Sequence, residues 1–152
     1  MKKLTRVSLW SAAVLAGLFV AIQFVPVNRV NPPVETDAPS TAEAHAVLKR
    51  ACYDCHSNET VWPWYSHVAP VSWLVARDVS KGREELNFST WNRLDTQERV
   101  KILKKSWEEV QDGEMPLWFY LPPHPSARLT AADREVLRAW SLVAHTQATG
   151  AP

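Results

Sequence analysis

The two cysteines of the chain constrain its structure more than any other feature. Cys52 and Cys55 stand three positions apart with His56 directly after them, and the 152 residues hold no further cysteine. Two thiols at this spacing, at the end of a helix, reach the two vinyl groups on one porphyrin edge and form thioether bonds. The imidazole that follows then ligates the iron. The pattern is typical of covalent haem attachment, so it predicts one haem c held by Cys52 and Cys55, with His56 as an axial ligand.

Three other roles of a Cys-x-x-Cys pair fit the sequence less well. A thioredoxin-like redox pair lies within a βαβ unit, and no segment here alternates like a strand. A zinc site needs four ligands, which carboxylates and the remaining histidines would have to complete. Those histidines are His45, His67, His124 and His145. A simple disulfide is also possible, but it gives the adjacent His56 no role.

The N-terminal segment is apolar and has a basic start. Lys2, Lys3 and Arg6 precede an apolar run over residues 7–27, close to the roughly 20 residues that span a bilayer. A secretory signal has a shorter apolar stretch of about 7–15 residues and a small-residue cleavage site, which this segment lacks. Residues 1–27 therefore predict a single transmembrane helix, with a cleaved signal as the alternative.

The basic residues before the span predict that the N-terminus stays in the cytoplasm and the remainder is exported. The expected location is the bacterial cytoplasmic membrane, with the domain facing the periplasm. With a cleaved signal the protein would instead be soluble in the periplasm. Residues 28–39 contain three prolines and no apolar periodicity, which predicts a short, stiff linker.

The remaining chain has helical periodicity, so the expected fold class is all-α. A capping box at residues 40–43 opens a helix that runs into Cys52. Three more helices are predicted: one from Pro70 to just before Gly82, with Val71, Leu74 and Val75 facing inward, one from Asp95 to Asp112-Gly113, and one from Thr130. Residues 61–65 and 115–125 are interrupted by proline and predict loops. The domain is expected over residues 40–146, followed by a tail, 147–152.

Met115 is the best candidate for the second axial ligand. It is the only methionine after the initiator and lies between Gly113 and Pro116, off any helical stripe. A packing role for its side chain remains open. Rival ligands are His124 and His67, or the sixth position is open.

Other polar and aromatic residues have less specific expectations. The histidines His45 and His145 are expected to be solvated. Aromatic residues after the motif either wall a haem pocket or pack in an ordinary core: Trp62, Trp64, Tyr65 and Trp73. Arg77, Arg83 and Arg128 are candidate partners of haem propionates. Seventeen basic residues nearly balance sixteen acidic ones, and no basic stripe appears, so nucleic-acid binding has no electrostatic support.

Several ordered motifs resemble the small bacterial haem-binding domain family of the c-type cytochrome superfamily. They are residues 52–58, 62–65, 70–73, 82–83, 86–88, 115–116 and 124–125, spread over about residues 41–144. The resemblance implies a cytochrome c-like helical fold around one covalent haem, preceded by a signal or membrane anchor. It assigns the haem role to Cys52, Cys55 and His56, and the distal-ligand role to Met115.

The expected function is single-electron transfer, not catalysis, because a buried iron with two protein ligands changes charge with little rearrangement. Its redox partner proteins are not indicated by the sequence. A haem-based gas or redox sensor is the alternative, and a peroxidase-like enzyme with an open iron site and acid–base residues nearby is a third.

Overall fold

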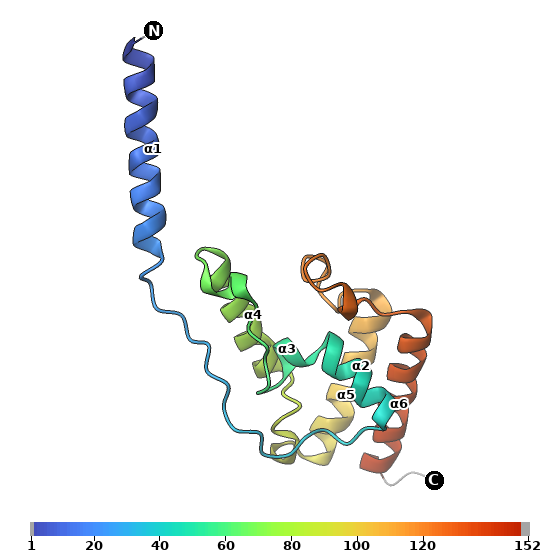
Figure 1. Cartoon of the computed structure of the whole chain (residues 1–152). Coiled ribbons are helices and arrows are strands. Elements are labelled where there is room, and N and C mark those ends of the chain that lie inside the picture. The colour runs from blue at the N-terminus through green and yellow to red at the C-terminus, as the bar shows by residue number, and fades with distance from the viewer. Residues whose placement is uncertain (1, 150–152) are drawn as a thin grey trace. The chain divides into compact units, whose positions relative to one another are not determined.

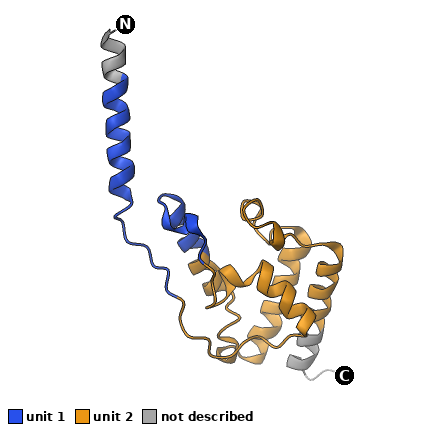
Figure 2. Cartoon of the chain, viewed as in Figure 1, with its two compact units in different colours: residues 1–30, 62–78 blue, residues 31–61, 79–152 orange. Residues whose placement is uncertain are grey.

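The computed structural model describes the backbone of residues 2–149 and the side chains of residues 8–142. In this part of the chain the regular structure is helical, and the only β pairing is an isolated bridge between Thr36 and Thr90. The all-α prediction is therefore confirmed. The chain divides into two compact units, residues 1–30 with 62–78 and residues 31–61 with 79–152 (Figure 2).

Unit 1 contains helix α1 (Lys2–Ile22), the 3-10 helix η1 (Trp64–His67) and the first part of α4 (Val71–Glu85) (Figure 1). The side-chain amide of Gln23 binds both backbone groups of Ala69. It accepts from the Ala69 N–H at 2.9 Å and donates to the Ala69 carbonyl at 3.2 Å. Arg29 donates to the Ser66 carbonyl at 3.1 Å. These bonds tie the segment after α1 to the turn before α4.

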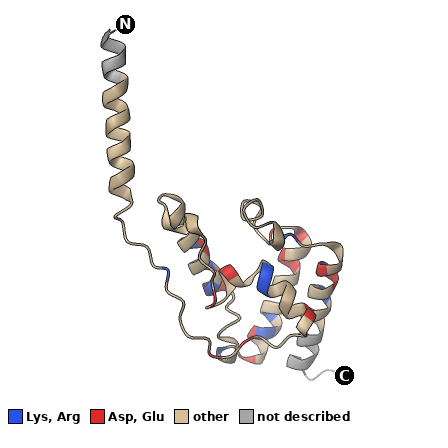
Figure 3. Ribbon diagram, viewed as in Figure 1, with Lys and Arg blue, Asp and Glu red and all other residues tan. Residues whose placement is uncertain are grey.

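The N-terminal segment is helical, but the predicted transmembrane span is not supported. Within the described side chains, α1 carries no charge (Figure 3), and its apolar residues Leu15 and Phe19 are exposed. No helix among the described residues nevertheless has both the length and the hydropathy needed to cross a bilayer. The side chains of Lys2, Lys3 and Arg6 lie outside the described part.

Unit 2 is a helical domain built on α2 (Ala42–Ala51), α5 (Thr96–Asp112) and α6 (Ala131–Thr149). Helix α5 packs along α6, and α2 packs against α6 and the one-turn helix α3 (Tyr53–His56) (Figure 1). Two 3-10 turns complete it, η2 (Trp91–Arg93) and η3 (Pro125–Ala127). Its core includes Tyr53, Phe88, Trp91, Leu103, Leu137 and Trp140.

Helix ends follow the local sequence closely. Asp95 and Glu98 form the predicted capping box of α5, and Gly113 ends the helix at φ 79°, a left-handed conformation that suits glycine. Helix α2 starts one residue later than predicted. Its N-cap is Thr41, whose hydroxyl accepts from the Ala44 N–H at 3.1 Å, in place of Ser40.

Helix α4 differs from its prediction in both its end and its buried face. It continues through Gly82 to Glu85. Val71 and Leu74, predicted to face inward, are 43% and 42% exposed, whereas Ser72 is buried. The buried positions of this helix are Ser72, Val79 and Gly82, which the predicted apolar stripe does not include.

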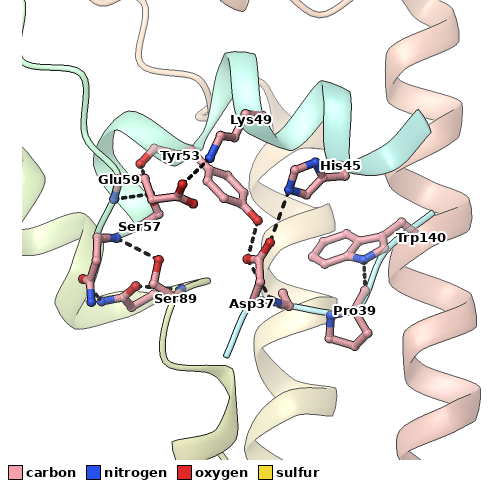
Figure 4. Close-up of polar contacts among 12 residues, drawn as sticks. Asp37, Pro39, His45, Lys49, Tyr53, Ser57, Glu59, Ser89 and Trp140 are labelled. Atoms are coloured by element: carbon pink, nitrogen blue, oxygen red, sulfur yellow. Dashed lines mark hydrogen bonds and ion pairs between the residues drawn. The ribbon is translucent and has the colours of Figure 1, made fainter. Parts of the chain in front are cut away.

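The stretch predicted as a linker, residues 28–39, is largely part of unit 2, which begins at Asn31. The N–H groups of Glu35 and Thr36 donate to the Ser89 carbonyl at 2.9 and 3.3 Å. Trp140 donates its indole N–H to the Pro39 carbonyl at 2.9 Å (Figure 4). We call residues 31–39 the strap, because they hydrogen-bond to the helical domain, unlike a linker without contacts.

The C-terminal boundary also moves. Helix α6 runs to Thr149, past the predicted domain end at residue 146 and into the predicted tail. The side chains of Val143 and His145, and residues 150–152, lie outside the described part, so the predictions for them stay predictions.

Candidate functional site

The Cys-x-x-Cys-His motif forms a tight helical junction in unit 2. Helix α2 ends at Ala51, and Cys52 joins it to α3, as the sequence predicted. The Cys52 carbonyl accepts from the N–H of Cys55 at 3.2 Å and from that of His56 at 2.9 Å. One carbonyl therefore fixes the second cysteine and the histidine relative to the first.

The His56 ring is held by a hydrogen bond to the backbone of the segment after α4. Its Nδ1 lies 3.1 Å from the Leu86 carbonyl. Because a carbonyl only accepts, Nδ1 carries the proton and Nε2 keeps its lone pair. Burial lowers the pKa of His56 despite the neighbouring carbonyls of Leu86 and Gly82, which act to raise it. The ring is therefore neutral at neutral pH, the state in which imidazole binds iron.

The two thiols are half-buried and are not joined to each other. Burial raises the pKa of the Cys52 thiol to about 12, and the adjacent Cys55 adds to the rise. Redox-active cysteines have the opposite property, a lowered pKa that favours the thiolate. Within the described residues, no three His, Cys, Asp or Glu side chains gather as ligands of a metal ion.

Tyr53, between the cysteines, anchors the motif to the strap. It is 1% exposed, and its hydroxyl donates to Asp37 at 2.5 Å (Figure 4). Its ring stacks on Phe88, with centroids 4.9 Å apart. His45, expected to be solvated, has a side chain that is 41% exposed and also lies 3.2 Å from the other Asp37 oxygen. The sequence did not identify Asp37 as the acceptor, because no local pattern links it to Tyr53, which lies 16 positions later.

Gly82 brings α4 against the motif. A Cβ at this position would lie 2.5 Å from the Cys55 carbonyl oxygen and 3.1 Å from the Cys55 Cβ. Both values are shorter than van der Waals contact, so only glycine permits this approach. The sequence placed Gly82 at a helix end; its actual role is to let a helix interior touch the second cysteine.

Arg83 organises the loop that follows His56. Its Nε donates to the Ser57 carbonyl at 2.8 Å, and its Nη2 donates to Thr60 Oγ1 at 2.9 Å. A further bond reaches Asn31 of the strap at 2.7 Å. Arg83, predicted as a partner of a haem propionate, thus hydrogen-bonds to the protein itself and holds this loop in place. Of the other two arginines, Arg77 lies 3.8 Å from Asp78 in unit 1, and Arg128 is exposed.

A loop after α5 carries Met115 and His124. The N–H groups of Glu114 and Met115 both donate to the Glu109 carbonyl, at 3.0 and 3.1 Å. The Met115 side chain is half-buried against the same core that Cys52 contacts. The structure thus places Cys52, Cys55, His56 and Met115 in unit 2, with Met115 packed against its core.

The two rival histidines lie in different units. His124 stacks on Tyr120, with ring centroids 4.1 Å apart and planes 12° apart, and Tyr120 donates to Asp54 of the motif at 2.8 Å. His67 belongs to η1 of unit 1 and is exposed. The aromatic residues Trp62, Trp64, Tyr65 and Trp73 also belong to unit 1, where Trp64 contacts Tyr65 edge-on. Their predicted contact with haem stays a prediction.

The donor set fits haem. Two thiols flank one helical turn, and His56 beside them bonds the Leu86 carbonyl through Nδ1. Comparison with known proteins agrees with this chemistry. The chain matches the family described as "Haem-binding domain" over residues 17–142. Searches of curated proteins and of solved structures gave no match. Because the matched stretch covers most of the chain and includes the motif, the protein belongs to the haem-binding domain family, and its cofactor is haem.

Proposed function

We propose that the domain binds one c-type haem covalently and carries single electrons at the periplasmic face of the cytoplasmic membrane. Cys52 and Cys55 would form the two thioether bonds, and His56 would be the proximal ligand. The observation that carries this proposal is the Nδ1 contact of His56 with the Leu86 carbonyl at 3.1 Å, next to two thiols on one turn. Haem supplies an iron that alternates between the ferric and ferrous states.

The residues around the motif suit an electron carrier. Phe88 approaches the His56 ring edge-on, with centroids 6.4 Å apart, and its N–H donates to the His56 carbonyl at 2.8 Å. These contacts fix the proximal ligand on both its ring and its backbone. Because His56 is fixed, the structure around the iron would rearrange little when an electron is gained or lost. Met115 is the proposed distal ligand, and a thioether there favours the ferrous state.

The location is proposed from residues 7–27. An apolar segment with a basic start directs the following chain across the cytoplasmic membrane, and attachment of haem to the motif would then take place outside the cytoplasm. Fractionation of cells that express the full chain tests this. Recovery of the haem-bearing domain in the cytoplasm would contradict it, and the mass of the exported chain distinguishes a retained anchor from a cleaved signal.

Covalent attachment is tested by the mass and absorption spectrum of the full chain, purified from a host that matures c-type haem. We expect the mass of the chain to increase by that of one haem, and this increase should remain after denaturation. Cys52→Ser and Cys55→Ser should each lose one thioether, which shifts the haemochrome spectrum. His45→Ala is the matched control, since it removes a histidine of the same unit and should leave attachment intact. A colourless protein whose two thiols both react with an alkylating reagent would overturn the proposal.

Ligation is tested by spectroscopy and carbon monoxide. An electron carrier with two protein ligands should be low-spin, show a sulfur-to-iron band near the red edge, and not bind carbon monoxide when reduced. Met115→Ala should abolish that band. Leu117→Ala, in the same loop and also half-buried, is the control and should keep it. A high-spin ferric form that binds carbon monoxide once reduced would favour a sensor or an enzyme instead.

A further inference from the structure

The loop between α5 and α6 is fixed to the haem-attachment motif by one side chain. The Tyr120 hydroxyl donates to Asp54 Oδ2 at 2.8 Å, across 66 positions of sequence. Asp54 lies between Cys52 and Cys55 on α3. Among the side-chain hydrogen bonds described for residues 113–124, this is the one that reaches the motif.

The acceptor of this bond is itself held firmly. The other oxygen of Asp54, Oδ1, accepts from the Val61 N–H at 2.9 Å. The Asp54 carbonyl accepts from the Thr60 hydroxyl at 2.8 Å. Both oxygens of the carboxylate and the backbone carbonyl are thus engaged, so Tyr120 binds to a fixed point. A bond to a charged acceptor is about twice as strong as one between neutral groups.

The same side chain also fixes the far end of the loop. The Tyr120 ring stacks on His124, with planes 12° apart, and the His124 N–H donates to the Leu121 carbonyl at 3.2 Å. At the near end, Met115 is held by the Glu109 carbonyl of α5. Between these two ends the loop contains local turns, such as the bond from the Tyr120 N–H to the Leu117 carbonyl at 3.0 Å.

We propose that Tyr120 is a positioning residue that holds the distal-ligand loop closed against the attachment motif through Asp54. It thereby controls access of small ligands to the sixth position of the iron. This inference rests on the proposed function. It applies whether Met115 or His124 supplies the ligand, because Tyr120 lies between them and contacts the motif directly.

Tyr120→Phe tests the role, since it removes the hydroxyl and keeps the ring for stacking on His124. Loss of one charge-assisted bond shifts an open–closed equilibrium roughly 10- to 100-fold. We therefore expect reduced Tyr120→Phe to bind carbon monoxide, which the wild type does not, and to show a weakened sulfur-to-iron band. Asp54→Ala should have the same effect, and the double variant should be no worse than either single variant.

Trp140→Phe is the control. It also removes one side-chain hydrogen bond of unit 2, from the indole N–H to the Pro39 carbonyl at 2.9 Å, but that bond reaches neither the motif nor the loop. It should lower stability and leave the reduced protein inert to carbon monoxide. If Tyr120→Phe lowers the melting temperature but keeps the wild-type spectrum and stays inert to carbon monoxide, the residue is merely structural and the inference is wrong. Carbon monoxide binding by both variants alike would also overturn it, because it would indicate a general loss of stability.

Failure of the proposed function looks different. In that case the wild-type chain itself carries no covalent haem or binds carbon monoxide freely, before any variant is compared. A wild type that is low-spin and inert to carbon monoxide, together with an unchanged Tyr120→Phe, would overturn the positioning role alone.

Discussion

At the scale of single residues, the site depends on atoms that approach more closely than most side chains allow. The Gly82 position illustrates this, because the nearest neighbour of an added Cβ is a backbone oxygen at 2.5 Å. A flexible side chain can move aside, but the Cys55 carbonyl belongs to the turn that orients the motif. Strain at Gly82 would therefore be transmitted to the second cysteine.

Gly82→Ala should destabilise the domain by about 1–3 kcal/mol, the usual cost of overpacking, and reduce the yield of attached haem. Thermal unfolding and the haem-to-protein ratio measure the two effects. The matched control is Gly17→Ala, since that helical glycine has nothing within 4 Å of an added Cβ. Equal behaviour of the two variants would contradict the close-approach role.

Asp133 makes stability depend on pH in the acid range. The Arg50 guanidinium and the Thr130 backbone and hydroxyl groups lower the pKa of Asp133 to about 2, and Arg50 lies 2.5 Å away. A carboxyl whose pKa falls on folding stabilises the fold above its unfolded pKa, and loses this contribution as the pH drops through the folded value.

Asp133→Asn should therefore cost about 1–2 kcal/mol at pH 7, discounted for solvent screening. The difference from wild type should shrink as the pH falls from about 4 to about 2. Urea unfolding at several pH values measures it. A penalty that stays constant down to pH 2 would show that the charge of Asp133 is not what stabilises the junction of α2 and α6.

At the scale of elements, the contacts between the strap and the motif could not be predicted from short sequence patterns. Asp37 accepts the hydroxyl of a tyrosine that is almost fully buried. Removing the acceptor leaves that hydroxyl unpaired inside the domain. The exposed Glu35 of the same strap instead pairs with Arg93 at the surface.

Asp37→Ala should thus lower the free energy of unfolding by about 1–3 kcal/mol, the cost of an unsatisfied buried polar group. Glu35→Ala, the control in the same strap, should cost less than about 1 kcal/mol, because exposed ion pairs contribute little. Denaturant unfolding of both variants measures this, and comparable losses would indicate that the strap binds through its backbone alone.

The elements also show what sequence can predict here. The ends of α5 were predictable because a capping box and a left-handed glycine act within a few residues. The buried face of α4 was not, because Gly82 is buried against Cys55, which is distant in sequence. Three residues of fixed spacing were enough to indicate haem, which the family match supports. Leu86, Asp37 and Tyr120 were missed as its partners, because their contacts are backbone-mediated or span many residues.

At the scale of the whole molecule, haem and the fold of unit 2 should be coupled. The motif lies on a helix of only four residues, and the loop of Met115 has mostly local backbone bonds. Elements this short hold their shape through tertiary contacts, not through their own helical propensity. A cofactor joined to α3 and ligated from the loop would bridge both elements.

Protein prepared without haem should therefore melt about 10–30 °C lower than the haem-bearing protein. A covalent haem stays on the unfolded chain, so it stabilises the domain only through the apolar contacts and iron ligation that it makes in the folded state. A gain of roughly 3–4 kcal/mol from these contacts corresponds to this shift, since each kcal/mol is worth about 4–8 °C in a domain near 100 residues. Limited proteolysis should cut the haem-free chain first within residues 113–124. The double variant Cys52→Ser/Cys55→Ser, also without haem, should behave like haem-free wild type, which separates the cofactor from the thiols. Identical melting and cleavage with and without haem would mean that unit 2 is fully formed by its helices and strap, with the cofactor only attached to it.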